Sequence, residues 1–202
     1  MLVAIEGIDG AGKTSVATAL VERLRSLGVE AVYTREPLST PFTRGLEEYS
    51  YLARKRPELA AFAMCADRAV HVGLVIQPLL EKGFVVVTDR YLYSTIAYQG
   101  AMGLDPKWLR ELCRVFPKPH LAIYLRIGVE EALKRLRARG FGRLSTLFEN
   151  RAFLERVAEI FEWLASEGEL VPVDASKPLE EVVEECLRLT LSKLKTLHRT
   201  AT

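Results

Sequence analysis

The chain has 202 residues, of which 49% are hydrophobic and 27% charged; this is typical of one folded domain and excludes an intrinsically disordered chain. A formal net charge of +2 gives no overall field that would attract nucleic acid or a membrane surface. Glu6 interrupts the first apolar stretch, and we find no run of about 20 apolar residues that would span a membrane. We therefore expect a single domain over residues 1–202 with no nucleic-acid or membrane partner.

The three cysteines are far apart in the sequence and form no CxxC motif: Cys65, Cys113 and Cys186. An odd number of scattered cysteines is typical of reduced thiols rather than of a disulfide framework or a metal site. We therefore expect a cytoplasmic protein.

Short apolar runs rich in Val, Ile and Leu alternate along the chain with helical stretches. The predicted strands are Leu2–Glu6, Glu30–Thr34, Phe84–Thr88, Leu121–Ile127 and Leu170–Val173. The predicted helices are Thr14–Leu27, Glu58–Glu81, Asp105–Val115, Glu130–Arg137, Arg151–Ser166 and Leu179–Lys195. Continuous apolar strands that alternate with helices predict an α/β fold with a parallel sheet flanked by helices.

The first strand is followed by a sequence that matches GxxxxGK[ST], the phosphate-binding P-loop motif. It comprises Gly7, Ile8, Asp9, Gly10, Ala11, Gly12, Lys13 and Thr14. Glycines let the backbone N–H groups converge on a phosphate, and the helix that follows points its positive end at the same place. In this motif the lysine reaches the β- and γ-phosphates and the hydroxyl binds Mg²⁺. The motif therefore predicts a nucleoside-triphosphate site.

A second acidic residue, Asp89, ends the third predicted strand and precedes Arg90. P-loop proteins hold Mg²⁺ with an aspartate at such a strand end, so we predict that Thr14 and Asp89 form the metal site. Arg35 ends the second strand, and six further arginines lie between residues 135 and 156. We find no histidine positioned as a general base, and we interpret the isolated His71, His120 and His198 as structural.

These arginines favour a nucleotide kinase over a hydrolase. ATP and a nucleoside monophosphate are both anions, so a kinase that joins them needs two sets of cationic side chains to hold their phosphates. The acceptor phosphate is already ionised, so no general base is needed. A guanine-reading NKxD motif is absent from the sequence, which argues against a GTPase.

Six segments together form a recognisable pattern: residues 6–14, 34–37 (Thr-Arg-Glu-Pro), 66–71 (Ala-Asp-Arg-Ala-Val-His), 89–91 with Ser94, 97–100 (Ala-Tyr-Gln-Gly) and 174–176. In the order and spacing of these segments the chain resembles the thymidylate kinase family over most of its length. The resemblance implies a five-stranded parallel sheet of strand order 2-3-1-4-5, an Arg-rich lid over about residues 138–151, and transfer of the γ-phosphate of ATP to dTMP with Mg²⁺. It also implies a homodimer through the long helix, whose apolar stripe includes Leu59, Phe62, Ala66, Ala69, Val70, Gly73 and Leu74.

The resemblance further implies a pocket for dTMP. Asp9 would contact the 3′-hydroxyl, Arg90 the phosphate, and Arg68 the thymine O4, a carbonyl that suits a side chain able only to donate. Thr95 would lie near thymine N3, and Tyr98 would crowd the 2′ position and so select deoxyribose. The full implied set is Asp9, Arg35, Met64, Arg68, Arg90, Thr95, Tyr98 and Gln99.

On the donor side, the resemblance implies that the P-loop, Arg135 and Ser176 bind ATP, and that Lys13 acts in catalysis with Arg90 and the lid arginines. Some family members carry an arginine directly after the P-loop aspartate, where this chain has Gly10. The chain thus resembles the branch whose lid supplies the catalytic arginine, and Arg139 and Arg143 are the candidates.

Two departures from the family pattern leave alternatives open. Leu38-Ser39-Thr40 replaces the usual Gly-Gly-Thr, and Met64 stands where a phenylalanine usually stacks on the base. The alternatives are a kinase for another nucleoside monophosphate or for a nucleoside and, from a different class, a catalytically silent nucleotide-binding regulatory protein.

The sequence holds only one asparagine and two glutamines, which is a trait of heat-adapted proteins. We therefore predict a thermophilic source and a high melting midpoint, measured by circular dichroism. A midpoint of thermal unfolding of roughly 50 °C, which is typical of mesophile domains, would contradict this prediction.

Overall fold

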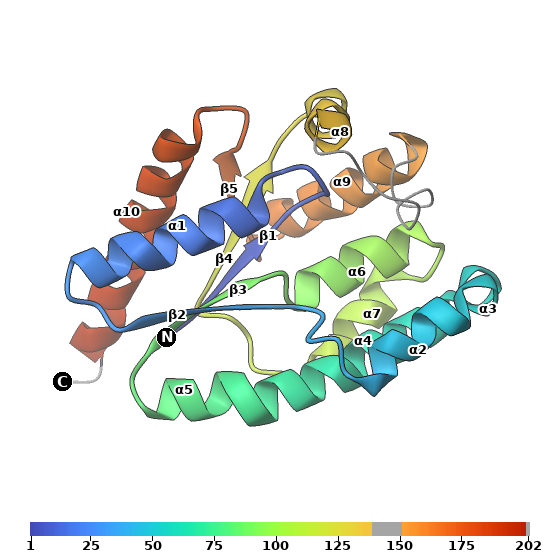
Figure 1. The fold of residues 1–202 in the computed structure, drawn as a ribbon, viewed down its shortest axis with the longest axis horizontal. Helices are drawn as coiled ribbons and strands as arrows, with labels where there is room; N and C mark the ends of the chain where they lie inside the picture. The colour runs from blue at the N-terminus through green and yellow to red at the C-terminus, as the bar shows by residue number, and fades with distance from the viewer. Residues whose placement is uncertain (139–150, 201–202) are drawn as a thin grey trace.

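The computed structural model describes residues 1–138 and 151–200 and shows one parallel sheet with helices on both faces (Figure 1). The five strands in this part of the chain are β1 (Leu2–Glu6), β2 (Ala31–Arg35), β3 (Val85–Asp89), β4 (Leu121–Arg126) and β5 (Val171–Asp174). Their order is β2-β3-β1-β4-β5, with every neighbouring pair parallel. The predicted α/β class and strand order are confirmed.

The helices connect the strands as crossovers. They are α1 (Lys13–Ser26), α2 (Pro41–Glu48), α3 (Ser50–Lys55), α4 (Pro57–His71), the π-helix η1 (Val72–Ile76), α5 (Gln77–Glu81), α6 (Leu92–Ala101), α7 (Pro106–Cys113), α8 (Val129–Ala138), α9 (Arg151–Ser166) and α10 (Leu179–Thr200). Helices α1 and α10 pack together on one face of the sheet, and α4 to α7 lie on the other, where α6 also packs on α9 (Figure 1).

The two central strands explain the continuous apolar runs of the sequence. Every residue of β1 and β3 is buried, because helices cover both faces of the sheet there. The register places Ile5 opposite Asp89, and Arg35 also lies opposite Asp89 on the other side of β3. The carboxyl ends of β1, β2 and β3 therefore meet at one edge of the sheet.

The predicted elements are confirmed to within a few residues, but α2, α3 and α6 were not expected from the sequence. Helix α6 is buried on nearly all sides, so it lacks the apolar–polar period that reveals a surface helix. Helices α2 and α3 are short, and α2 contains Pro41 and Gly45, which favour a loop.

The long helical stretch Pro57–Glu81 is, by length and composition, apolar enough to cross a membrane, although Asp67 and Arg68 interrupt its apolar residues. The core helix of a soluble protein passes the same test, so this is weak evidence for a membrane span.

Part of the expected apolar stripe points outward rather than into the core, as Phe62 (52% exposed) and Leu74 (73%) show.

Some predictions fall outside the described residues. Most of the expected lid, including Arg139 and Arg143, lies in the segment 139–150, and the side chain of His198 is also outside the described part. The three cysteines are buried and form no disulfide bond with one another.

Candidate active site

The loop between β1 and α1 has the backbone of a phosphate cradle. Gly10 (φ 86°) and Gly12 (φ 89°) lie in the left-handed region, which glycine adopts without steric cost. A Cβ at Gly10 would lie only 2.4 Å from the carbonyl oxygen of Ala132 in α8, so this position also needs glycine for space. Helix α1 begins at Lys13, directly after the loop, and directs its N-terminal N–H groups toward it.

Lys13 is buried within this loop. Its Nζ donates to the carbonyl oxygens of Gly7 (3.0 Å) and Ile8 (2.8 Å) and lies 3.7 Å from a carboxylate oxygen of Asp9. Burial, together with the nearby charge of Arg90, lowers the pKa of Lys13 to about 8. The ammonium group is therefore positioned at the loop by the loop's own backbone.

Thr14 and Asp89 meet as predicted. The Thr14 hydroxyl donates to Oδ2 of Asp89 over 2.5 Å, and the buried Oδ1 of Asp89 has no hydrogen-bond partner in the described residues. A buried carboxylate oxygen without a partner is unfavourable unless a ligand satisfies it. Hydroxyl and carboxylate oxygens are the ligands that Mg²⁺ prefers, so this pair fits the ion.

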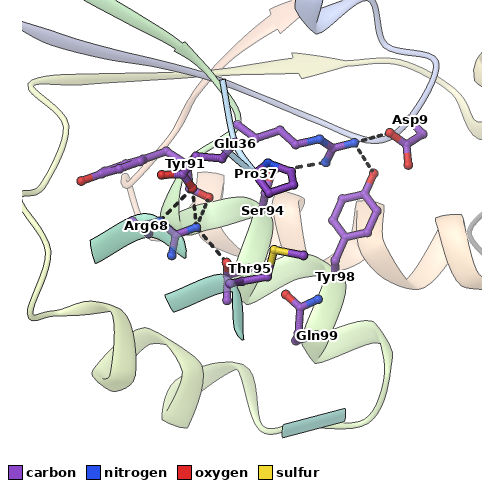
Figure 2. A pocket seen from close by; sticks show the side chains of 11 residues that line it. Asp9, Glu36, Pro37, Arg68, Tyr91, Ser94, Thr95, Tyr98 and Gln99 are labelled. Atoms are coloured by element: carbon purple, nitrogen blue, oxygen red, sulfur yellow. Dashed lines mark hydrogen bonds and ion pairs between the residues drawn. The ribbon is translucent and has the colours of Figure 1, made fainter. Parts of the chain in front are cut away.

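Arg90 links the phosphate loop to the facing helix α6. Its guanidinium contacts the carboxylate of Asp9, donates to the Tyr98 hydroxyl (3.5 Å) and Ser94 Oγ (3.4 Å), and lies 4.8 Å from the Tyr98 ring centroid (Figure 2). Burial alone would raise the pKa of Asp9, but the charges of Arg90 and Lys13 outweigh it and hold that pKa below its usual value. The arginine is thus fixed between an ionised aspartate and an aromatic face.

A cavity of about 230 Å³ opens beside Arg90, and most of the predicted acceptor residues line it (Figure 2). Its walls are formed by Asp9, Glu36, Pro37, Met64, Arg68, Arg90, Tyr91, Ser94, Thr95, Tyr98 and Gln99. The guanidinium of Arg90 is held by Asp9 and Tyr98, and that of Arg68 by Glu36 and Thr95, so the cavity is lined by two separate cationic groups. This arrangement suits a molecule that carries both an anionic group and a polar ring.

Arg68 is held by its neighbours on every side. It donates to Glu36, to Thr95 Oγ1 (2.9 Å) and to the carbonyl oxygen of Tyr91 (3.0 Å), and it is 2% exposed. Glu36 is held in turn by His71, whose Nδ1 lies 3.1 Å from Glu36 Oε1 and whose Nε2 lies 2.7 Å from Thr34 Oγ1. His71 thus belongs to the buried chain that orients Arg68, in agreement with its interpretation as a structural histidine.

Glu6 caps helix α6 from a neighbouring strand. Its fully buried carboxylate accepts from the backbone N–H groups of Tyr91 (3.0 Å) and Ser94 (3.3 Å) and from the Ser94 hydroxyl (2.5 Å). Burial raises the pKa of Glu6 to about 6, although the Ser94 hydrogen bond and the charge of Arg90 lower it. Glu6 thereby ties the strand that carries the phosphate loop to the helix that lines the cavity.

Of the predicted acceptor residues, Arg35 lies outside this cavity, as do Arg135 and Ser176 of the predicted donor site. Arg35 is exposed at the end of β2 and does not line the cavity. Arg135 in α8 donates to the carbonyl oxygen of Ala175 (3.0 Å), and the Ser176 hydroxyl donates to Asp174 (2.6 Å). Arg135 and the loop 174–176 therefore lie together, as expected for one side of a donor site.

Five residues of the site were not expected from the sequence: Glu6, Glu36, Pro37, Tyr91 and Ser94. Glu6 carried a usable signal, because an acidic residue that ends a wholly apolar strand needs a buried partner. Glu36 and Ser94 stood inside matched segments, but their partners come from distant parts of the chain, and the sequence alone does not show such pairings.

Comparison with known proteins gives a consistent result. The family model described as "Thymidylate kinase" matches residues 5–186. A "Probable thymidylate kinase" of Archaeoglobus fulgidus is 41% identical over 195 residues, covering 96% of each chain. A "Probable thymidylate kinase" of Staphylothermus marinus is 37% identical over 94% of each chain, and a "Thymidylate kinase" of Brachyspira hyodysenteriae is 36% identical over 97% of this chain and 95% of its own.

Glu6 predicts a specific pH dependence of stability. A folded pKa of about 6, above the ordinary value of 4.5, means that the folded state binds the proton more tightly, so Glu6 favours folding most at low pH. This contribution falls as the pH rises from 4.5 to 6, by about 2 kcal/mol in all. Urea unfolding of wild type and Glu6→Gln between pH 4 and 7 should show the difference in unfolding free energy changing by that amount. A difference that is independent of pH would contradict the assignment.

Proposed function

Because the chain belongs to the thymidylate kinase family, we propose that it transfers the γ-phosphate of ATP to dTMP and releases ADP and dTDP. The observation that carries this proposal is the cavity beside the phosphate loop, which is lined by Arg90 and by Arg68 with Thr95. In this proposal the dTMP phosphate lies at Arg90 and the thymine lies against Arg68.

Lys13 and Arg90 would supply most of the chemistry. Phosphoryl transfer requires positioning and charge stabilisation more than covalent participation. Lys13 and the loop N–H groups would hold the phosphates of ATP, and Arg90 would hold the acceptor phosphate in line with them. The acceptor phosphate is already ionised at neutral pH, so this assignment requires no general base.

Mg²⁺ fits the oxygen pair of Thr14 and Asp89. When bound, it would neutralise charge on the transferring phosphates. The Asp89 Oδ1 that lacks a partner within the described residues would then gain one. Arg139 and Arg143, which lie outside the described residues, remain the proposed lid arginines, and Arg135 with Ser176 remains the proposed border of the adenine.

Tyr98 accounts for a preference for deoxyribose. Its ring packs under Arg90, its hydroxyl accepts from Arg90, and the side chain is 7% exposed, so it has little freedom to move aside. A ribose 2′-hydroxyl would meet this ring in the proposed orientation.

We further propose that the protein works in the cytoplasm of a heat-adapted cell.

A panel of acceptors tests the proposed reaction directly. With ATP and Mg²⁺ in a coupled ADP assay run warm, dTMP should be phosphorylated faster than dUMP, UMP, dCMP, AMP or thymidine. A stronger reaction with another acceptor would move the assignment to a related kinase. ATP binding without any turnover would favour a silent regulatory protein instead.

Two substitutions separate the donor and acceptor sites. Lys13→Ala should lower kcat by about 10²–10³-fold because it removes stabilisation of the transferring phosphoryl group. Arg90→Ala should mainly raise the KM for dTMP and leave the KM for ATP nearly unchanged. Lys107→Ala and Arg114→Ala, which change exposed cations away from the site, are the matched controls. If Arg90→Ala weakens ATP and spares dTMP, the two sites are interchanged.

The exposed apolar face of α4, η1 and α5 is the surface that we propose for a homodimer. Phe62 and Leu74 are large and exposed, and an apolar face of this kind is typical of protein–protein contact. Sedimentation should give twice the monomer mass of 22.7 kDa. Leu74→Glu should give a monomer, whereas Leu27→Glu, at an exposed leucine after α1, should leave the dimer intact. A wild-type mass equal to the monomer would exclude the dimer.

A further inference from the structure

The segment between β2 and α2 forms one wall of the cavity without help from the sheet. Pro37 lines the cavity, and the chain then passes through Leu38, Ser39 and Thr40 before α2 begins. Ser39 has φ 60°, in the left-handed region that a residue with a Cβ rarely adopts. Some interaction must hold this backbone, because a serine left to itself would take another conformation.

The carboxylate of Asp67 provides that interaction. Its Oδ2 accepts from the backbone N–H of Leu38 (2.6 Å), and its Oδ1 accepts from the backbone N–H of Thr40 (2.9 Å) and from the Thr43 hydroxyl (2.9 Å). The two backbone hydrogen bonds lie on either side of Ser39. Asp67 is 1% exposed, so water does not compete for these bonds.

The charge state of Asp67 agrees with this role. Burial raises the pKa of its carboxyl group, but the hydrogen bonds from Thr40, Leu38 and Thr43 together outweigh burial and leave that pKa below its usual value. The group is therefore an anion at neutral pH, and hydrogen bonds to an ionised acceptor are stronger than those to a neutral one.

Asp67 reaches this segment from the same helix that carries the base-facing side chains. Met64 and Arg68 of α4 line the cavity, whereas Asp67 does not. Arg68 and His71, one turn apart on α4, hold Glu36 just before Pro37, and Asp67 holds the residues just after it. Helix α4 thus fixes both the floor of the cavity and the adjoining wall.

We propose that Asp67 is a positioning residue for the acceptor nucleotide: it holds residues 37–43 in the shape that brings Pro37 against the bound base. The proposal rests on the proposed function, because the molecule that it positions is dTMP. Asp67 acts on affinity for the acceptor and leaves the phosphoryl-transfer groups at Lys13 and Asp89 unaffected.

Asp67→Asn is the direct test. Asparagine keeps the size of the side chain but replaces one acceptor oxygen with an N–H₂ group that faces a backbone donor. The KM for dTMP should rise by about tenfold or more, while kcat changes by less than about threefold and the KM for ATP stays constant. Thr43→Val removes only the hydroxyl contact and should raise the KM for dTMP by a smaller factor.

A second substitution separates positioning from a general loss of stability. If Asp67 acts by holding Ser39 in the left-handed region, Ser39→Gly should relieve the need for it, because glycine takes that conformation freely. The double variant Asp67→Asn with Ser39→Gly should recover most of the affinity for dTMP, and Ser39→Gly alone should bind dTMP within about twofold of wild type. A merely structural aspartate would not be rescued in this way.

Asp105→Asn is the matched control. Asp105 also accepts a backbone N–H, that of Lys107 (2.9 Å), but it caps α7 away from the cavity. Its substitution should leave the KM for dTMP unchanged. The proposal is overturned if Asp67→Asn leaves that KM unchanged, if it lowers kcat instead, or if Ser39→Gly restores nothing.

Hydrogen exchange on the protein without substrate tests the same contacts independently of activity. The peptide spanning residues 37–44 should exchange faster in Asp67→Asn than in wild type or Asp105→Asn, because the Leu38 and Thr40 amides lose their acceptor. An unchanged rate would overturn the role of Asp67. If wild type fails to phosphorylate dTMP but this exchange difference is found, the proposed function fails while the role of Asp67 in holding the segment stands.

Discussion

The parallel pairing of β1 with β3 is the constraint on which the site depends. With Ile5 opposite Asp89, the first residues after both strands must emerge side by side at the carboxyl edge of the sheet. The phosphate loop follows one strand and Arg90 follows the other, so Asp9 and Arg90 meet although 80 residues separate them in the chain. A slip of one residue would turn Asp89 to the other face of the sheet and separate it from Thr14.

Charges in the site are paired. Half-buried Arg90 faces Asp9, buried Arg68 faces Glu36, and Glu6 accepts the hydrogen bonds at the start of α6. An unpaired charge held away from water would be strongly unfavourable, so the carboxylates stabilise the two guanidinium groups. The same pairing orients each arginine, which gives the cavity fixed donors rather than mobile ones.

The fold could be predicted well because its signals are local. Strands buried on both faces gave continuous apolar runs, and the glycine-rich loop with Lys13 and Thr14 predicted a phosphate site. The structure places Thr14 of this loop beside Asp89. Helix α6 was missed because nearly all of its residues are buried and no polar face gives a period. The contacts of Glu6, Asp67 and His71 could not be predicted from the sequence, because they join residues 24–88 positions apart and depend on how the helices pack.

Gly10 has a further consequence for how charge can reach the transferring phosphate. The carbonyl group of Ala132 in α8 occupies the space that a Cβ at position 10 would need. In this backbone a close-packed α8 and an arginine at position 10 are mutually exclusive, because any side chain there would push the two segments apart. In the proposed function, a further cation at the phosphate would therefore have to come from another segment of the chain.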